Sequence, residues 1–234
     1  MPSVLITGSN SGLGLEFVRQ YAVEGWHVVA TCRSPDKATD LKAVDGDIEV
    51  RALDVADFDA VDRLATDLTG TPLDVLILNA GKTKRPQGIG TMDYEAWAEI
   101  FRVNTMAPLK MAEALVENVA TSDQKKIIGI SSRLASIEFA TAEDRTFKLR
   151  GAYYPYRTTK AALNMVMRTM AAELAPRGIL TASLCPGWVR TKMGGDNATF
   201  STAESVGWMR AITARLTAAE SGTFFSHEGE VYPF

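Results

Sequence analysis

A tyrosine and a lysine one helical turn apart are the residues of this sequence whose types and spacing point most directly to chemistry. Tyr156 and Lys160 stand at positions i and i+4, just after Pro155, which suits the first turn of a helix. Both side chains then lie on one face of that helix. An ammonium beside a phenol favours the phenolate and lowers the phenol pKa. Tyr156 is therefore expected to exchange a proton with a carbonyl or alcohol oxygen.

Hydroxyl and amide groups occur where they could assist this proton transfer. Ser131 and Ser132 follow an apolar run at 127–130, and ligands of open α/β sheets bind at the carboxyl ends of such strands. A serine hydroxyl there can stabilise negative charge on a substrate oxygen. The sequence alone leaves open which serine faces the site. Asn104 lies in a largely apolar helix, where a helix bend or a core hydrogen bond explains it equally well.

A glycine-rich turn near the start of the chain predicts a dinucleotide site. Gly8, Gly12 and Gly14 lie in the segment TGSNSGLG, between an apolar run and an amphipathic pattern. Glycine permits a sharp strand-to-helix turn and lets the backbone approach a pyrophosphate. The helix N-terminus then directs free N–H groups at the anion. No Lys-Ser or Lys-Thr pair follows the last glycine, so the segment is not a P-loop.

The end of the second predicted strand favours NADP(H) over NAD(H). A carboxylate there would accept hydrogen bonds from a ribose 2′-OH, but the sequence carries Arg33 and no acid. A guanidinium can pair with the 2′-phosphate of NADP, and the hydroxyls of Ser9 and Ser11 are close in sequence. A plain surface role for Arg33 stays open.

Strand-like and helix-like segments alternate along the chain and must position these residues. Strands are predicted at 4–7, 28–30, 48–53, 75–78, 127–130, 179–184 and 224–225, with 48–53 near an edge because it carries Glu49 and Arg51. Helices are predicted from Leu13 to a C-terminal Gly25, at 57–68, at 93–119 with a bend near Pro108, at 155–175 and at 202–217. This order predicts a parallel sheet covered by helices on both faces, in one domain spanning 1–234.

Composition and charge exclude several other classes of function. The chain has 234 residues, 46% of them hydrophobic, and a net charge of −3, which gives no reason to expect nucleic acid or a membrane as partner. No signal peptide is expected before the first strand, and the cysteines, Cys32 and Cys185, suit a reduced cytoplasmic setting. His27 and His227 have no partner at metal-ligand spacing. The G-x-S-x-G elbow of serine hydrolases is absent.

Taken together, these motifs resemble those of the short-chain dehydrogenase/reductase family over nearly the whole chain. The matching segments are TGSNSGLG at 7–14, Asp54-Val55, NAG at 79–81, VNT around Asn104, YRTTK at 156–160 and PGWVRT at 186–191. SSRLASI and the closing GTFFSHEGEVYPF are most similar to small carbonyl reductases and C-factor-like proteins. The resemblance implies a Rossmann-type, doubly wound three-layer αβα sandwich with about seven mostly parallel strands.

The resemblance also implies roles for individual residues. The family's active serine is followed three residues later by glycine, and Ala135 in that place selects Ser132 over Ser131. Tyr156 is then the general acid/base, Lys160 binds the nicotinamide ribose and tunes the tyrosine, and Asn104 holds a water that links Lys160 to solvent. Cofactor contacts are expected from Gly8, Ser9, Asn10, Ser11, Gly12, Leu13, Gly14, Arg33, Asp54, Val55, Asn79, Ala80, Gly81, Tyr156, Lys160, Pro186, Gly187, Val189 and Thr191.

The predicted function is hydride transfer between nicotinamide and a small carbonyl or alcohol, with aldehyde or ketone reduction favoured. Loops 82–91, 133–155 and 190–203 are expected to flank the pocket, and Phe139, Tyr153, Trp188 and Met193 are candidates for its apolar lining. Two alternatives stay open: a regulatory or redox-sensing NADP-binding protein with little turnover, and an NAD-dependent alcohol dehydrogenase. The helices at 93–119 and 155–175 are apolar on more than one face, which predicts a homodimer or homotetramer.

Overall fold

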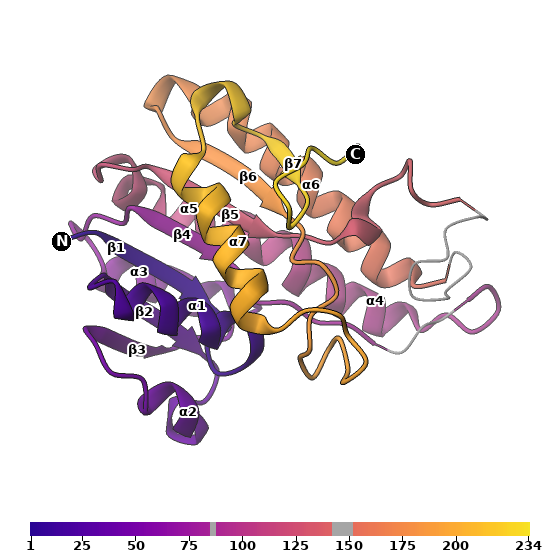
Figure 1. Cartoon of the computed structure of the whole chain (residues 1–234), viewed down its shortest axis with the longest axis horizontal. Helices are drawn as coiled ribbons and strands as arrows, with labels where there is room; N and C mark the ends of the chain where they lie inside the picture. Colours follow the sequence, from indigo (N-terminus) through magenta and orange to yellow (C-terminus); the bar gives the residue numbers. More distant parts are fainter. Residues whose placement is uncertain (85–87, 142–151) are drawn as a thin grey trace.

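A parallel sheet forms the centre of the molecule. The computed structural model describes residues 1–84, 88–141 and 152–234, and within them the strands follow the order β3-β2-β1-β4-β5-β6-β7 (Figure 1). Every neighbouring pair is parallel. The strands are β1 (Ser3–Thr7), β2 (His27–Cys32), β3 (Ile48–Ala52), β4 (Val75–Leu78), β5 (Lys126–Ile130), β6 (Leu180–Leu184) and β7 (Thr223–Phe225). The predicted parallel sheet of about seven strands is confirmed.

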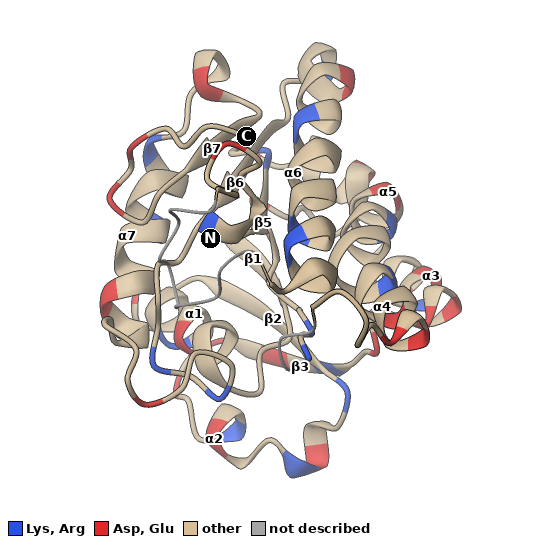
Figure 2. Ribbon diagram, turned by 90° about the vertical axis from the view of Figure 1, so that its right-hand side faces the viewer, with Lys and Arg blue, Asp and Glu red and all other residues tan. Residues whose placement is uncertain are grey.

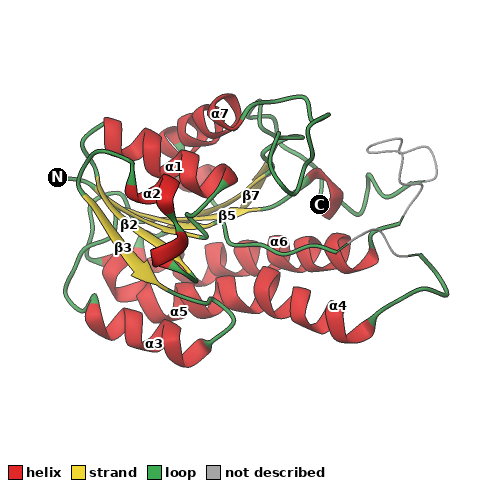
Figure 3. Cartoon of the chain, turned by 90° about the horizontal axis from the view of Figure 1, so that it is seen from below, coloured by secondary structure: helices red, strands yellow, loops and turns green. Residues whose placement is uncertain are grey.

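Helices cover both faces of this sheet. In Figure 3, α1, α2 and α7 lie on one side of the strands, and α3, α4, α5 and α6 lie on the other. The helices are α1 (Gly12–Val23), α2 (Thr39–Lys42), α3 (Phe58–Asp67), α4 (Tyr94–Phe101), α5 (Ala107–Ala120), α6 (Tyr154–Leu174) and α7 (Thr202–Arg215). The three-layer arrangement is as expected from the sequence, whereas the short helix α2 was not predicted.

The strands are apolar throughout because both of their faces are buried. Along β1, Val4 and Ile6 pack into the cluster beneath α1 and α7, whereas Leu5 packs into the cluster beneath α3, α5 and α6. All three side chains are fully buried. A strand covered on both sides needs apolar residues at successive positions, so the alternation typical of half-exposed strands is lost.

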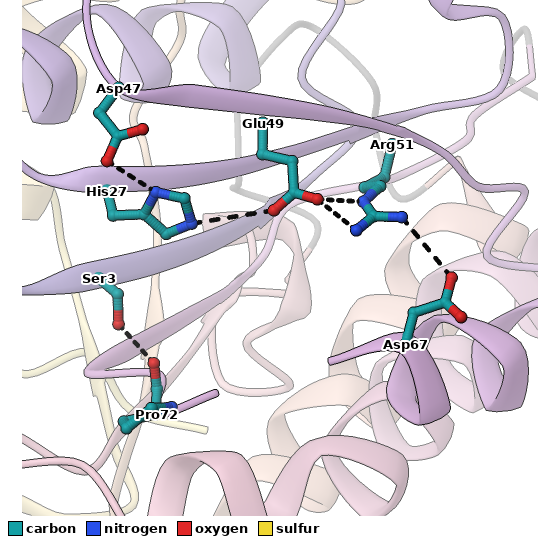
Figure 4. Close-up of polar contacts among 7 residues, drawn as sticks. All are labelled: Ser3, His27, Asp47, Glu49, Arg51, Asp67 and Pro72. Atoms are coloured by element: carbon teal, nitrogen blue, oxygen red, sulfur yellow. Dashed lines mark hydrogen bonds and ion pairs between the residues drawn. The ribbon is translucent and has the colours of Figure 1, made fainter. Parts of the chain in front are cut away.

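The outer strand β3 carries a row of charged side chains. Glu49 and Arg51 form an ion pair on this strand, Arg51 approaches Asp67 to 3.6 Å, and His27 Nδ1 lies 2.9 Å from Asp47 Oδ2 (Figure 4). The prediction of an edge position is confirmed. Charged side chains on an edge strand discourage pairing of its free backbone groups with another chain.

The long helix predicted at 93–119 is interrupted. A π-helical turn, η2 (Arg102–Met106), separates α4 from α5. The irregular turn lies just before Pro108, close to the predicted bend, and Pro108 itself lies in the first turn of α5. Proline has no N–H to donate to the carbonyl four residues before it, which here belongs to Asn104. The π turn brings this stretch into a different hydrogen-bonding register.

Charged residues of both signs are spread over the surface. On α3 an arginine lies among three aspartates, whereas the charged residues of α4 are both glutamates (Figure 2), and the net charge of the whole chain is −3. In the part of the chain that the structure describes, no helix combines the length and the apolar character needed to cross a bilayer.

Candidate active site

A cavity of about 800 Å³ opens where the strands of the sheet end. Its lining comes from the segments that follow β1, β2, β3, β4, β5 and β6, and from the start of α6. This is the carboxyl edge at which open α/β sheets bind their ligands. The volume is that of a small-molecule or cofactor site.

The glycine turn after β1 forms one end of the cavity. Gly8 and Gly12 have φ angles of +71° and +58°, which favour glycine. A Cβ on Gly14 would lie 2.2 Å from the Gly8 carbonyl oxygen, so the turn closes only without a side chain there. The amide of Asn79 donates to the carbonyl oxygens of Thr7 at 2.8 Å and Gly8 at 3.2 Å. The turn is thereby fixed against the end of β4, with its backbone facing the cavity.

Ser9 is the member of this turn that does not face the cavity. Its hydroxyl donates to the Ile6 carbonyl at 2.8 Å, its N–H donates to the Thr31 carbonyl at 2.9 Å, and the residue is fully buried. The predicted cofactor contact of Ser9 is therefore wrong, because both of its donors tie β1 to the turn and to β2. Asn10, Ser11, Gly12 and Leu13 do line the cavity.

Arg33 lies at the same end of the cavity, directly after β2. It is exposed and lines the opening together with Asp54 and Val55, which follow β3. The Asp54 carboxylate accepts a hydrogen bond from the Ala56 N–H at 3.0 Å. A guanidinium near a backbone cradle of this shape suits a ligand with an additional phosphate group.

The proton-handling residues lie on the wall formed by β5 and α6. Ser132, Tyr156 and Lys160 all line the cavity, and a hydrogen bond joins the side chains of Ser132 and Tyr156. The Lys160 ammonium donates to the Ile130 carbonyl at 2.7 Å and lies 6.0 Å from the centre of the Tyr156 ring. Tyr153, which precedes α6, has a left-handed φ of +76° and meets the Tyr156 ring edge-on.

The two serines after β5 have different surroundings. The Ser131 hydroxyl is buried and donates to the Asn164 side-chain oxygen at 2.7 Å. Ser132 is the serine that is hydrogen-bonded to Tyr156. Ser131 therefore ties β5 to α6, and Ser132 is left to face a ligand.

Asn104 lies in the π turn, fully buried and outside the cavity lining. Its side-chain nitrogen donates to the Lys82 carbonyl at 2.9 Å and to the Thr159 hydroxyl at 3.1 Å, and its oxygen accepts from the Lys82 N–H at 2.8 Å. A Cβ on Gly81 would lie 3.6 Å from the Asn104 oxygen and 3.8 Å from the Lys160 nitrogen. Asn104 thus fixes the loop after β4 against α6, beside Lys160.

The electrostatics of Tyr156 differ from the sequence prediction. Burial raises the pKa of Tyr156 to about 12, the neighbouring Cys185 adds to the rise, and the hydrogen bond from Ser132 opposes it. The predicted fall in the phenol pKa is wrong, because the Lys160 ammonium turns to the Ile130 carbonyl instead of the phenol oxygen. The phenol is therefore protonated at neutral pH and able to donate a proton.

Replacing Lys160 with methionine should stabilise the protein near pH 7. Burial lowers the pKa of Lys160 from 10.5 to about 8, a difference worth roughly 3 kcal/mol at 1.36 kcal/mol per pKa unit. Below pH 8 the folded state carries the full penalty of a buried ammonium. Between pH 8 and 10.5 the unfolded state binds more protons, so the wild-type free energy of unfolding rises with pH in that window.

Urea unfolding of both proteins from pH 7 to 10 measures this effect. The methionine variant should be the more stable by about 1–2 kcal/mol at pH 7, after allowance for the lost hydrogen bond to the Ile130 carbonyl. Its advantage should shrink as the pH approaches 10. A variant that is less stable than the wild type at pH 7 would contradict the assigned penalty.

The loop after β6 closes the cavity from the opposite side. Pro186, Gly187, Val189 and Thr191 line the opening. The Thr191 methyl group lies 3.4 Å from the position of a Cβ on Gly12, so this loop faces the glycine turn directly. Gly187 has a φ of +77°, and a Cβ there would come within 2.8 Å of the Phe200 ring.

The predicted apolar lining is only partly correct. Tyr153, Trp188 and Met193 line the cavity, but Phe139 does not, because its ring packs beneath the Arg133 guanidinium and against Tyr232. Residues 85–87 and 142–151 of the predicted loops lie outside the described residues. Several other residues line the cavity that the sequence analysis did not single out. They lie at strand ends, on the π turn or in the described parts of the three predicted loops: Cys32, Leu53, Lys82, Thr83, Val103, Leu134, Lys192 and Gly194.

The described residues hold no group of three His, Cys, Asp or Glu side chains placed to bind a metal ion. Both cysteines, Cys32 and Cys185, are buried and free.

Comparisons with known proteins bear on the family of this chain and on its fold. The model of a family described as short chain dehydrogenase matches residues 2–201. The C-signal protein of Myxococcus xanthus is 35% identical over 170 residues, which is 73% of this chain and 98% of that protein. The NADPH-bound carbonyl reductase from chicken fatty liver superposes with a TM-score of 0.88 at 31% identity, covering 100% of this chain and 99% of that one. The carbonyl reductase Sniffer of D. melanogaster gives 0.88 at 30% identity, with 100% of both chains covered.

Proposed function

Because the chain belongs to the short-chain dehydrogenase family, whose model matches residues 2–201, it is an oxidoreductase, and we propose that it reduces small aldehydes or ketones with NADPH. One observation carries the proposal. The glycine turn, Arg33 and the Ser132–Tyr156–Lys160 group all line a single cavity, so a dinucleotide and a carbonyl substrate can be bound side by side.

The residues of the cavity fit NADP(H). The glycines of the turn at 8–14 carry no Cβ, so its backbone can approach a pyrophosphate closely. Arg33, which follows β2, supplies a cation for a 2′-phosphate. A similar carbonyl reductase binds NADPH. When bound, the nicotinamide supplies or accepts the hydride. The further contacts proposed are those of Asn10–Leu13, Asp54, Val55, Asn79–Gly81 and the loop at 186–191, all of which contribute to the lining.

The protein's own residues would handle the proton and the developing charge. The Ser132 hydroxyl, which donates to the Tyr156 phenol here, would turn to the substrate oxygen, and the Tyr156 phenol would donate to the same oxygen. As negative charge grows on that oxygen, the Tyr156 proton would move to it. The Lys160 nitrogen, 6.0 Å from the centre of the Tyr156 ring, would stabilise the resulting phenolate by its charge, and Asn104 holds the neighbouring loop in place. The water-linking role of Asn104 remains a proposal.

The pKa of Tyr156 favours reduction over alcohol oxidation. A phenol with a pKa of about 12 is protonated near neutral pH, and carbonyl reduction needs this protonated form. Alcohol oxidation starts from the phenolate and therefore suits this environment less well. Alcohol oxidation is thus the weaker alternative, and the preference for NADP over NAD rests on Arg33. A purely regulatory NADP-binding protein would not require Ser132, Tyr156 and Lys160 at one cavity wall.

NADPH consumption with a panel of aldehydes and ketones tests the proposed function. Steady turnover with at least one carbonyl, and a kcat about a hundredfold lower but still measurable in Ser132→Ala, would support carbonyl reduction. Tight NADPH binding without turnover of any carbonyl would favour the regulatory alternative. A higher kcat/KM for NAD⁺ than for NADP⁺ in oxidation of the corresponding alcohol would favour the dehydrogenase alternative.

We also propose that the protein is a homodimer or homotetramer. The side chains of Phe101, Met106 and Leu109, on α4, the π turn and α5, are each more than a third exposed, and Met165 on α6 is 67% exposed. Apolar side chains gathered on helices that pack against each other suit contact with a second copy. Light scattering at micromolar concentration should give a multiple of 25.4 kDa, and a monomeric mass would contradict the proposal.

The whole of residues 1–234 is proposed to act as one domain, because a single sheet includes strands from Ser3 to Phe225. The buried, free thiols of Cys32 and Cys185 suit the proposed reduced, cytoplasmic setting.

A further inference from the structure

Ser132 stands on a short segment that cannot hold it rigidly by itself. It precedes a 3-10 turn, η3 (Arg133–Ala135), and its hydroxyl oxygen accepts from the Leu134 N–H at 3.2 Å. A turn of this length makes few internal hydrogen bonds, so the direction of the hydroxyl depends on what packs against the turn. A misplacement of about 1 Å in a group that meets the substrate can cost about a hundredfold in rate.

One side of the turn is held by the end of β6. The Ser131 N–H donates to the Leu184 carbonyl at 2.7 Å, and the Arg133 N–H donates to the Cys185 sulfur at 3.1 Å. Cys185 is itself bound through its N–H to the Phe225 carbonyl of β7. The backbone before and after Ser132 is therefore fixed to neighbouring strands.

The other side of the turn is held by three side chains that we call the ring clamp: Arg133, Phe139 and Tyr232. The Arg133 guanidinium lies 3.8 Å from the centre of the Phe139 ring and 5.9 Å from that of Tyr232. The two rings meet edge-on, with their centres 5.4 Å apart and an interplanar angle of 87°. A hydrogen bond joins the Arg133 and Tyr232 side chains. The residue directly after Ser132 is thus held between two aromatic rings.

Tyr232 is itself anchored to the sheet. Its N–H donates to the Phe224 carbonyl of β7 at 2.8 Å, and its ring meets the Phe224 ring at 5.5 Å. Phe224 is fully buried. The backbone of Phe234 accepts a hydrogen bond from the Ile137 N–H, so the segment 232–234 contacts both ends of the loop at 133–139.

We propose that Tyr232 and Arg133 are positioning residues for Ser132, and that the segment after β7 thereby belongs to the reaction machinery without touching the substrate. The proposal rests on the proposed carbonyl reduction. Neither Tyr232 nor Arg133 lines the cavity, so loss of the ring clamp should change the rate of the chemical step more than cofactor binding.

Tyr232→Ala should lower kcat about tenfold, with KM and the NADPH dissociation constant changed less than twofold. Tyr232→Phe keeps the ring and should retain at least half of the wild-type kcat. Trp26→Ala is the matched control, because it also removes a partly buried ring, which meets Tyr21 edge-on at 4.7 Å. Trp26 directly precedes β2, at the end of that strand away from the cavity. This control variant should leave kcat within twofold. Tyr232→Leu replaces the alanine variant if that variant does not fold.

A double-variant cycle separates positioning from a general loss of packing. In the Ser132→Ala background, Tyr232→Ala should change kcat less than twofold, because there is no hydroxyl left to position. An equal tenfold loss in both backgrounds, or an unchanged kcat in the single variant, would overturn the proposal.

Hydrogen exchange gives a readout that does not depend on turnover. The Ala135 and Ser136 N–H groups, which donate to the Ser132 and Arg133 carbonyls, should exchange at least tenfold faster in Tyr232→Ala and at the wild-type rate in Trp26→Ala. Unchanged exchange would refute the clamp even if the wild type reduced no carbonyl. A wild type that reduces no carbonyl, with exchange changed as expected, would refute the proposed function and leave the ring clamp in place.

Discussion

Replacing Tyr156 with phenylalanine is expected to lower kcat about a thousandfold or more while NADPH binds within about threefold of the wild-type affinity. The change removes only the hydroxyl, and the ring keeps its edge-on contact with Tyr153. General acid catalysis by a positioned side chain contributes about 10²–10⁴ in rate. Absorbance of NADPH gives kcat, and nucleotide fluorescence gives the dissociation constant.

The neighbouring Tyr154 provides the matched control. It lies on the same helix, is 38% exposed and does not line the cavity. Tyr154→Phe removes the same atom from the same helical turn, so its kcat should stay within twofold of the wild type. Full activity in Tyr156→Phe would show that the proton comes from another group.

Replacing Arg33 with aspartate is expected to reverse the preference between the two nicotinamide cofactors. The variant loses a guanidinium that pairs with a 2′-phosphate and gains a carboxylate that repels it, so the NADPH dissociation constant should rise about a hundredfold. The same carboxylate can accept hydrogen bonds from a free ribose 2′-OH. The NADH dissociation constant should therefore fall or stay unchanged. Fluorescence titration with both nucleotides measures the two effects.

Arg177→Asp makes the same change in net charge at a distance from the cavity. Arg177 pairs with Glu117 at 2.7 Å and does not contribute to the cavity lining. This variant should alter NADPH affinity less than twofold, which excludes a general effect of charge. Parallel losses for NADPH and NADH in Arg33→Asp would place the 2′-phosphate elsewhere.

The sheet could be predicted from the sequence because its signals are local. Residues 75–78 are continuously apolar, and β4 has these same bounds since both of its faces are covered. The glycine turn was equally predictable, because the strained φ angles at Gly8 and Gly12 restrict the residue type at each position. The π turn at 102–106 could not be predicted, because apolar periodicity does not show to which carbonyl each N–H donates its hydrogen bond.

Predictions about the site failed where an outcome depends on long-range contacts. Spacing placed Lys160 near Tyr156, but the direction of the Tyr156 pKa change is set by burial and by the carbonyl that the lysine nitrogen meets. The inward direction of the Ser9 hydroxyl and the pairing of Phe139 with Tyr232 have no local signal either.

The π turn makes chain length as important as residue identity between α4 and α5. An α-helix turns by about 100° per residue, and η2 holds one residue more per hydrogen-bonded ring than an ordinary helix does. The five residues of η2 cover roughly the angle of four α-helical residues, so an uninterrupted α-helix of the same length would rotate α4 relative to α5 by about 100°. Either Ile100 or Met111, both buried, would then be turned towards water. Deleting one residue from 102–106 would instead give an ordinary helical turn with the faces of α4 and α5 still in phase. Sequence diversification of this stretch should accordingly keep the π turn at constant length or remove one residue together with it.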